Sequence, residues 1–229
     1  MNYAFARNEK NQNIAANPTV VFQTTKVTMQ LKDSTGALID TGTVQYYAGG
    51  WRDMGTTSGG QVTKELLPNN YTISMNYAFA RNEKNQNVTA NPVVVFQTKN
   101  VAVSLQTCSG GSNLPGGDVQ YYSGGWRTFG TTGSSGTVNN ELLPNIYTFG
   151  MNYAFARNEK IQDVNSNLNV VFTTTMVSSA YSGSIQYYSG GWRTFTKPSM
   201  YMLPNTYTFS FGGAQKSIPI SGCSIGIAP

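Results

Sequence analysis

Histidine is absent from this sequence, and cysteine occurs only twice, at Cys108 and Cys223. Without histidine there is no Ser-His or Cys-His nucleophile pair, and one of the two usual zinc ligands is missing. Glu65 and Glu141 each stand two residues before the same short motif, Leu-Pro-Asn, but Tyr201 occupies this position where the motif occurs a third time. No sequence pattern supplies the two carboxylates at a fixed separation that acid–base hydrolysis requires. The sequence therefore predicts a protein that is not an enzyme, with no catalytic residue, metal ligand or cofactor.

Charge and long apolar runs are also scarce. Charged residues make up 11% of the chain, and the 15 lysines and arginines are spread along it rather than gathered in one segment. A nucleic-acid-binding protein concentrates its basic charge, so nucleic acid is not expected as a partner. The longest apolar run, around Val93 to Phe96, is far too short to span a bilayer, so no membrane insertion is expected. The 12% of aromatic residues argues against disorder.

Three long sequence blocks recur along the chain in the same order. The block MNYAFARNEK begins at Met1, Met75 and Met151. A second block, QYYxGGWR, begins at Gln45, Gln120 and Gln186, and a third, LPNxYT, begins at Leu67, Leu143 and Leu203. Such self-similarity is the signature of a repeat architecture. The chain therefore consists of three copies of a unit of about 75 residues.

Each unit has the hydrophobic pattern of β-strands. Apolar residues alternate with polar ones along Tyr71–Phe79 and along Tyr147–Phe155. The same alternation places Val27, Met29 and Leu31 on one face of a strand. Turn residues separate these short runs, and no ten-residue stretch has helical periodicity. We predict an all-β protein of three tandem antiparallel β-sandwich modules, of the Ig-like kind.

The phase of the repeat suggests where the modules begin and end. Residues 1–17 copy the closing strands of a unit, and the third unit is shorter than the others. The predicted organisation is an unpaired strand pair at 1–18, a first module at 19–93, a second at 94–168, and a shortened third module with a divergent end at 169–229.

The LPNxYT block resembles a segment of known modules. It is similar to the Leu-Pro-Gly-x-Tyr segment of prealbumin-like and Ig-like modules in prokaryotic secreted surface proteins, with Asn69, Asn145 and Asn205 where that family usually has glycine. The resemblance implies a secreted, cell-surface protein whose modules serve as stalk, adhesin or filament subunit. It implies a non-catalytic structural role for this chain.

The strand pair at the start of the chain suggests how copies could associate. It is apolar at Met1, Tyr3 and Phe5, and an isolated hairpin is marginally stable in water. Addition of this pair to a sheet of another copy would build a head-to-tail homopolymer. The divergent end would supply the partner surface with Phe211, Ile218 and Ile220. In the alternative interpretation, the pair packs on its own chain.

The QYYxGGWR block offers a second function, a multivalent carbohydrate-binding adhesin. Flat aromatic faces stack on sugars, and arginine and tyrosine bind sugar oxygens. In the structural alternative, Trp51 caps the core and its neighbour Arg52 lies over the ring. One tyrosine of each pair is expected in the core and the other outside. The candidate glycan-binding residues are Tyr47, Trp51, Arg52, Tyr122, Trp126, Arg127, Tyr188, Trp192 and Arg193.

The two cysteines are far apart in sequence. Cys108 falls in a turn of the second unit and Cys223 near the end of the chain. In a β-rich chain of extracellular character they are candidates for a disulfide within the chain or between chains, and free thiols are the third alternative.

Overall fold

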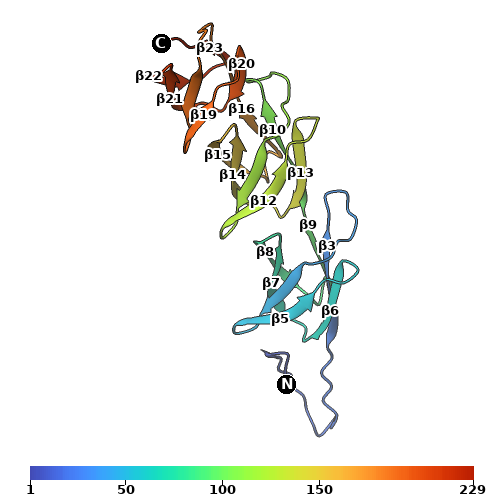
Figure 1. Cartoon of the computed structure of the whole chain (residues 1–229). Helices are drawn as coiled ribbons and strands as arrows, with labels where there is room; N and C mark the ends of the chain where they lie inside the picture. Colours follow the sequence, from blue (N-terminus) through green and yellow to red (C-terminus); the bar gives the residue numbers. More distant parts are fainter. The chain divides into compact units, whose positions relative to one another are not determined.

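The computed structural model describes residues 1–229 and is built from β-strands and turns (Figure 1). None of its segments is a helix long and apolar enough to cross a membrane. The chain divides into two compact units. One comprises Met1–Asn100 with Glu141–Asn145, and the other comprises Val101–Asn140 with Ile146–Pro229.

The N-terminal residues and the first module contain nine strands. Their bounds are β1 (Asn2–Tyr3), β2 (Ala6–Arg7), β3 (Thr25–Lys32), β4 (Thr43–Tyr47), β5 (Trp51–Thr56), β6 (Gln61–Leu66), β7 (Asn70–Tyr77), β8 (Ala80–Asn87) and β9 (Val93–Gln97). β1 and β2 form a two-stranded sheet of their own. The first module has a 3-stranded sheet in the order β6-β3-β9 and a 4-stranded sheet in the order β5-β4-β7-β8.

The second and third modules repeat this topology. The second consists of β10 (Lys99–Gln106), β11 (Asp118–Tyr122), β12 (Trp126–Thr131), β13 (Thr137–Leu142), β14 (Ile146–Tyr153), β15 (Ala156–Asp163) and β16 (Asn169–Thr173). The third consists of β17 (Thr175–Ser178), β18 (Ile185–Tyr188), β19 (Trp192–Thr194), β20 (Ser199–Met202), β21 (Asn205–Phe211), β22 (Ala214–Ile220) and β23 (Ser224–Gly226). Their sheets are β13-β10-β16 with β12-β11-β14-β15, and β20-β17-β23 with β19-β18-β21-β22.

One pair of strands in each module is parallel, which the sequence did not indicate. β9 pairs in parallel with β3, and β16 and β23 pair in the same way with β10 and β17. The sequence pattern assigned Val94 and its neighbours to the start of the second module. Their pairing places them at the end of the first, so the sheets change at Thr98, between β9 and β10. Hydrophobic alternation identifies a strand but not the sheet that it joins.

The core of each module lies between its two sheets. Val27, Met29 and Leu31 are fully buried along β3, as their alternation predicted. Ile73 and Met75 are fully buried on the facing sheet. Each such side chain contributes about 1.5–3 kcal/mol through its removal from water. The predicted all-β fold of tandem sandwich modules is confirmed, and with it the resemblance to Ig-like and prealbumin-like modules.

The LPNxYT block closes the turn before the central strand of the four-stranded sheet. The hydroxyl of Tyr71 donates a hydrogen bond of 2.9 Å to the carbonyl of Leu67, and that of Tyr207 donates one of 2.9 Å to the carbonyl of Leu203. Both rings are buried, so the hydroxyl needs a partner inside the protein. This bond back to the upstream backbone, like the tyrosine corner of Ig-like sandwiches, explains the spacing of leucine and tyrosine in the block.

Candidate functional site

The MNYAFARNEK block forms a hairpin whose tip carries a phenylalanine. In the hairpin β14–β15, Tyr153 pairs with Ala156, which leaves a two-residue turn. Both turn residues are left-handed, with φ of 48° at Ala154 and 62° at Phe155. Such turns normally take Asn-Gly, because a left-handed backbone costs other residues roughly 1–2 kcal/mol each. The turn is therefore strained, and its geometry places Phe155 at the end of the hairpin.

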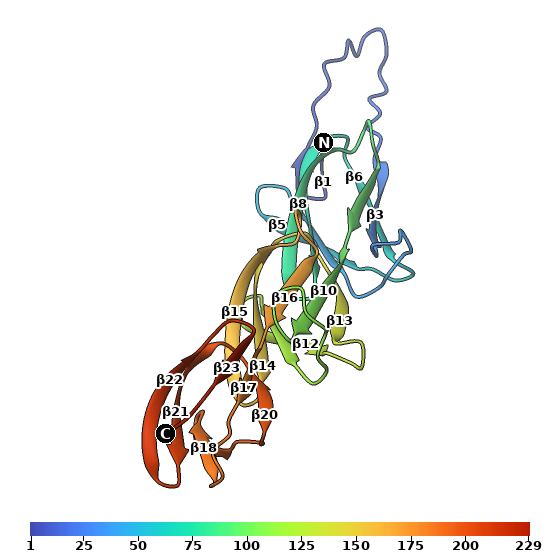
Figure 2. The same ribbon diagram turned by 90° about the horizontal axis from the view of Figure 1, so that it is seen from above.

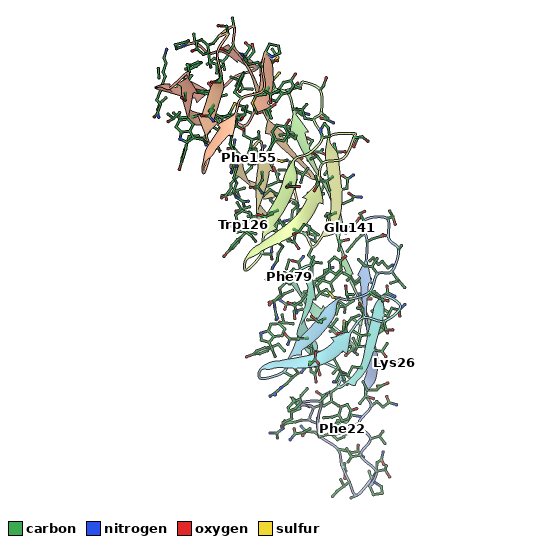
Figure 3. The ribbon with its side chains drawn as sticks, in the orientation of Figure 1. Phe22, Lys26, Phe79, Trp126, Glu141 and Phe155 are labelled. Atoms are coloured by element: carbon green, nitrogen blue, oxygen red, sulfur yellow. The ribbon has the colours of Figure 1, made fainter.

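The tip of the β14–β15 hairpin, in the second module, contacts the third module. The guanidinium carbon of Arg193 lies 4.2 Å from the centre of the Phe155 ring. The hydroxyl of Ser189 donates a hydrogen bond of 2.7 Å to the carbonyl of Phe155, and that of Tyr187 donates one of 3.3 Å to the carbonyl of Ala154. Figure 3 shows Phe155 at the tip of its hairpin, beside the third module. We call this set of contacts the hairpin joint.

A second row of contacts lies beside the hairpin joint. Asn158, on β15, donates a side-chain hydrogen bond of 3.3 Å to the carbonyl of Pro204 in the third module. Burial raises the pKa of Tyr153, and Tyr201 of the third module adds to this effect. Residues of the MNYAFARNEK block of one module thus contact the QYYxGGWR and LPNxYT blocks of the next.

The N-terminal hairpin β1–β2 makes the same joint with the first module. Ala4 and Phe5 form the same left-handed turn, with φ of 46° and 60°. The guanidinium carbon of Arg52 lies 3.8 Å from the centre of the Phe5 ring, and the hydroxyl of Tyr46 donates to the carbonyl of Ala4 at 3.3 Å. Asn8 donates to the carbonyl of Pro68 at 3.0 Å, as Asn158 does to that of Pro204.

Residues 9–24 connect this N-terminal hairpin to β3 without forming a strand (Figure 2). Val20–Phe22 match the β9 sequence, yet no strand of the chain pairs with them. The ammonium group of Lys10 lies over the Phe22 ring at 5.6 Å, as that of Lys84 lies over Phe96 at 5.1 Å. The segment therefore keeps the local side-chain contacts of the repeat while its backbone lacks a partner strand.

The QYYxGGWR block forms the hairpin β4–β5 and its two equivalents. Tyr46 is buried, whereas Tyr47 is 49% exposed, as the alternation predicted. Gly49 and Gly50 turn the chain with φ of 64° and 157°. The rings of Tyr47 and Trp51 meet edge to face, with centroids 5.6 Å apart. The same pairing recurs in the other two modules.

The arginine over the tryptophan is not the neighbour that the sequence suggested. Arg81 of β8 lies over the Trp51 ring, with its guanidinium carbon 3.9 Å from the ring centre. Arg52 instead lies over Phe5, because successive residues of a strand point to opposite faces. Arg81 is held by Glu83 at 2.8 Å and by the side-chain oxygen of Gln45 at 3.0 Å.

The second module repeats this arrangement, and the third departs from it. The guanidinium carbon of Arg157 lies 4.0 Å from the centre of the Trp126 ring. At the equivalent position opposite Ser210, the third module has Gln215. Trp192 is 41% exposed. The tryptophans thus form two kinds of surface: Trp51 and Trp126 have an arginine over one face, whereas the third module has Gln215 in place of that arginine.

Glu141 forms a polar cluster that sequence reasoning missed. Its carboxylate accepts hydrogen bonds from the Ser34 amide at 3.1 Å, from the Ser34 hydroxyl at 2.5 Å, and from the hydroxyl of Thr98. Ser34, Thr98 and Glu141 all belong to the compact unit that comprises Met1–Asn100 with Glu141–Asn145. Figure 3 labels Glu141. The sequence weighed Glu141 only as half of a carboxylate pair with Glu65. A single acid bound by two hydroxyls and an amide is a structural anchor.

The candidate interface residues fall into two groups. Met1, Tyr3 and Phe5 are exposed in the N-terminal hairpin. Phe211 and Ile220 are buried within the third module, and Ile218 is half-buried. The burial of these side chains in their own module leaves little apolar surface at the divergent end for a partner.

The third hairpin, β21–β22, lacks the tip of the other hairpins. Gly212 and Gly213 stand where the other copies have alanine and phenylalanine, and they take positive φ without strain. The third module therefore has no side chain with which to make a hairpin joint at this tip. No group of three or more cysteine, aspartate or glutamate side chains is placed to hold a metal ion.

A scan against protein-family models finds no match, and a search of curated proteins finds none. Among solved structures, the chain is similar to the Bacillus anthracis TIE protein, with 12% identity and a TM-score of 0.32 over 89% of this chain and 50% of that one. The chain thus spans half the length of that protein. It is also similar to the shaft pilin SpaA of Lactobacillus rhamnosus GG, with 12% identity and a TM-score of 0.28 over 66% of this chain and 97% of that one. A third similar structure is BcpA with the substitution D312A, the major pilin subunit of Bacillus cereus, with 9% identity and a TM-score of 0.26 over 89% and 98%.

Proposed function

We propose that this chain is a non-catalytic extracellular structural protein, a subunit of a surface filament or stalk. The observation that carries the proposal is the recurrence of one hairpin joint. The N-terminal hairpin makes it with the first module, and the second module makes it with the third. A joint that reuses the same three sequence blocks suits a protein whose function depends on the number of its modules.

The second and third modules are coupled in two ways that suit a load-bearing role. β16 ends at Thr173 and β17 begins at Thr175, so Thr174 alone links sheets of the two modules. The hydroxyl of Thr174 donates to the carbonyls of Gln106 and Thr107, which fixes the connector to the second module. The hairpin joint adds a contact between the same two modules. Bending at the connector would therefore require the joint to open.

The proposed assembly between copies uses the N-terminal hairpin. This hairpin pairs only with itself and contacts the first module through side chains, so docking of its tip describes these contacts better than strand addition. Residues 9–24 connect it to the module without regular structure. In the proposal, the hairpin of one copy leaves its own first module and makes the same joint on another copy.

Electron microscopy and sedimentation of the full chain at several concentrations test this proposal. We expect filaments or higher oligomers that become more abundant with concentration. The substitution Phe5→Ala should reduce them, and Phe155→Ala is a matched control because its joint lies within one chain. A protein that stays monomeric at every concentration would contradict the filament proposal.

The second candidate function is binding of glycans by the QYYxGGWR hairpins. Its support is the exposed edge-to-face pair of tyrosine and tryptophan in each module. Arg81 and Arg157 already cover one face of Trp51 and Trp126, so Trp192 is the best platform for a sugar. Titration of glycans against tryptophan fluorescence tests this candidate, with Trp192→Phe expected to lose more response than Trp51→Phe. A monomer whose fluorescence responds to a glycan would favour this function over the first.

A further inference from the structure

The two cysteines lie in loops that the fold brings together. Cys108 follows β10 in a tight turn, where its carbonyl accepts a hydrogen bond of 2.9 Å from the amide of Gly111. Cys223 directly precedes β23, the strand that completes the smaller sheet of the third module. One cysteine thus belongs to the second module and the other to the third, and both belong to the same compact unit.

The connector between these modules holds the backbone on both sides. Thr174 donates through its hydroxyl to the carbonyl of Thr107 at 3.2 Å, next to Cys108. The hydroxyl of Thr175 donates to the carbonyl of Gly222 at 2.7 Å, and the amide of Met176 donates to the carbonyl of Cys223 at 3.0 Å. Three consecutive residues therefore fix the positions of both cysteine loops.

The two side chains lie near enough to influence each other. The neighbouring Cys223 thiol, together with burial, raises the pKa of Cys108 above its ordinary value. Both are free thiols, Cys108 half-buried and Cys223 exposed, so an oxidant in solution can reach them. The hydrogen bonds of Thr174, Thr175 and Met176 hold the two cysteine loops on either side of one short connector, and a disulfide requires such proximity of the two backbones.

We propose that Cys108 and Cys223 form a disulfide that links the second module covalently to the C-terminal strand of the third. The reaction is thiol–disulfide exchange with a small-molecule disulfide or a disulfide oxidoreductase. The thiolate of one cysteine attacks the external disulfide and releases one thiol. The thiolate of the other then attacks the mixed disulfide, so the Sγ–Sγ bond forms as the second external thiol leaves. The two cysteine protons pass to water and then to the released thiolates, and the external disulfide takes up the two electrons.

The bond has a structural consequence at the end of the chain. β23 is short and pairs only with β17, in parallel. A short edge strand is the part of a sheet that separates first when it is pulled or frays. The bond would hold the start of β23 beside the second module, so the two cysteine loops could not separate while it is intact. This inference is independent of the proposed assembly and of glycan binding.

Equilibration of the full chain in a buffer of reduced and oxidised glutathione tests the proposal, with the protein mass and thiol content measured after denaturation. We expect an intact mass lower by two hydrogen atoms than that of the reduced chain, and no reaction with a thiol reagent. Tryptic digestion without reduction should yield the peptide 100–127 joined to the peptide 217–229. Oxidation should also raise the unfolding temperature, and the Cys108→Ser/Cys223→Ser variant should show no such rise.

Two results would overturn the proposal. One is a chain whose two thiols remain free in a buffer that oxidises a control dithiol of ordinary stability. The other is a disulfide between copies, seen as a dimer on a non-reducing gel. The single variants Cys108→Ser and Cys223→Ser separate these cases, because each leaves one thiol that can form only a bond between chains or with glutathione.

Discussion

Arg193 of the third module lies over the ring of Phe155 of the second, with its guanidinium carbon 4.2 Å from the ring centre. The Nε atom of Arg193 is buried without a hydrogen-bond partner. A guanidinium over an aromatic face contributes about 0.5–1 kcal/mol at an exposed site, and more as water is excluded from the contact. The same relationship joins Arg52 to Phe5, where the arginine Nε is also buried without a partner. The joint therefore rests on a cation–π contact that occurs twice.

The turn at the tip of β14–β15 is predicted to be a site of removable strain. Ala154→Asn should stabilise the protein by up to about 1 kcal/mol, because asparagine tolerates the left-handed backbone better than alanine. The carbonyl of residue 154 stays available to Tyr187. Urea unfolding measures the effect, with Ala214→Asn as a control at an exposed strand position. A loss of stability in Ala154→Asn would show that the turn is not strained.

The tyrosine that closes the LPNxYT block is predicted to stabilise its module through the hydroxyl. Tyr207→Phe removes the partner of the Leu203 carbonyl in a buried site, which should cost about 1–3 kcal/mol. Tyr188→Phe, whose ring is 51% exposed, should change the free energy of unfolding by less than about 0.5 kcal/mol. Equal effects of the two substitutions would show that the hydroxyl of Tyr207 does not stabilise the third module.

Stability is predicted to fall in alkaline solution. Burial raises the pKa of Tyr71, Tyr147 and Tyr207 above the ordinary value of 10.0. The folded protein then keeps protons that the unfolded chain releases, so the stabilisation is complete below about pH 10 and is lost as the pH rises further. Urea midpoints measured between about pH 8 and pH 11 should decline, with a smaller decline in Tyr207→Phe. A midpoint independent of pH over this range would contradict the burial of these hydroxyls.

The sequence was sufficient for the repeat, the strands and the buried faces, because these are local patterns. The alternation of Val27, Met29 and Leu31 fixes which side of β3 enters the core wherever that strand lies. The sequence was not sufficient to assign β9 to its module, because a strand between two modules has the same hydrophobic pattern whichever sheet it joins.

The partners of the arginines could not be predicted for a similar reason. Arg52 and Trp51 are adjacent in sequence, and their separation onto opposite faces brings each to a residue far along the chain. Ser34 and Glu141 are more than a hundred positions apart, and neither has a distinctive pattern. Contacts of this kind join residues that are far apart in the sequence, so no local pattern reveals them.

A double-mutant cycle between Phe155 and Arg193 tests the hairpin joint most directly. The free energy of unfolding would be measured for the wild-type chain, Phe155→Ala, Arg193→Met and the double variant. We predict a coupling of about 0.5–2 kcal/mol between the two positions. The pair Phe5→Ala and Arg193→Met, which belongs to two different joints, should be additive. Additivity of Phe155→Ala and Arg193→Met as well would contradict the joint.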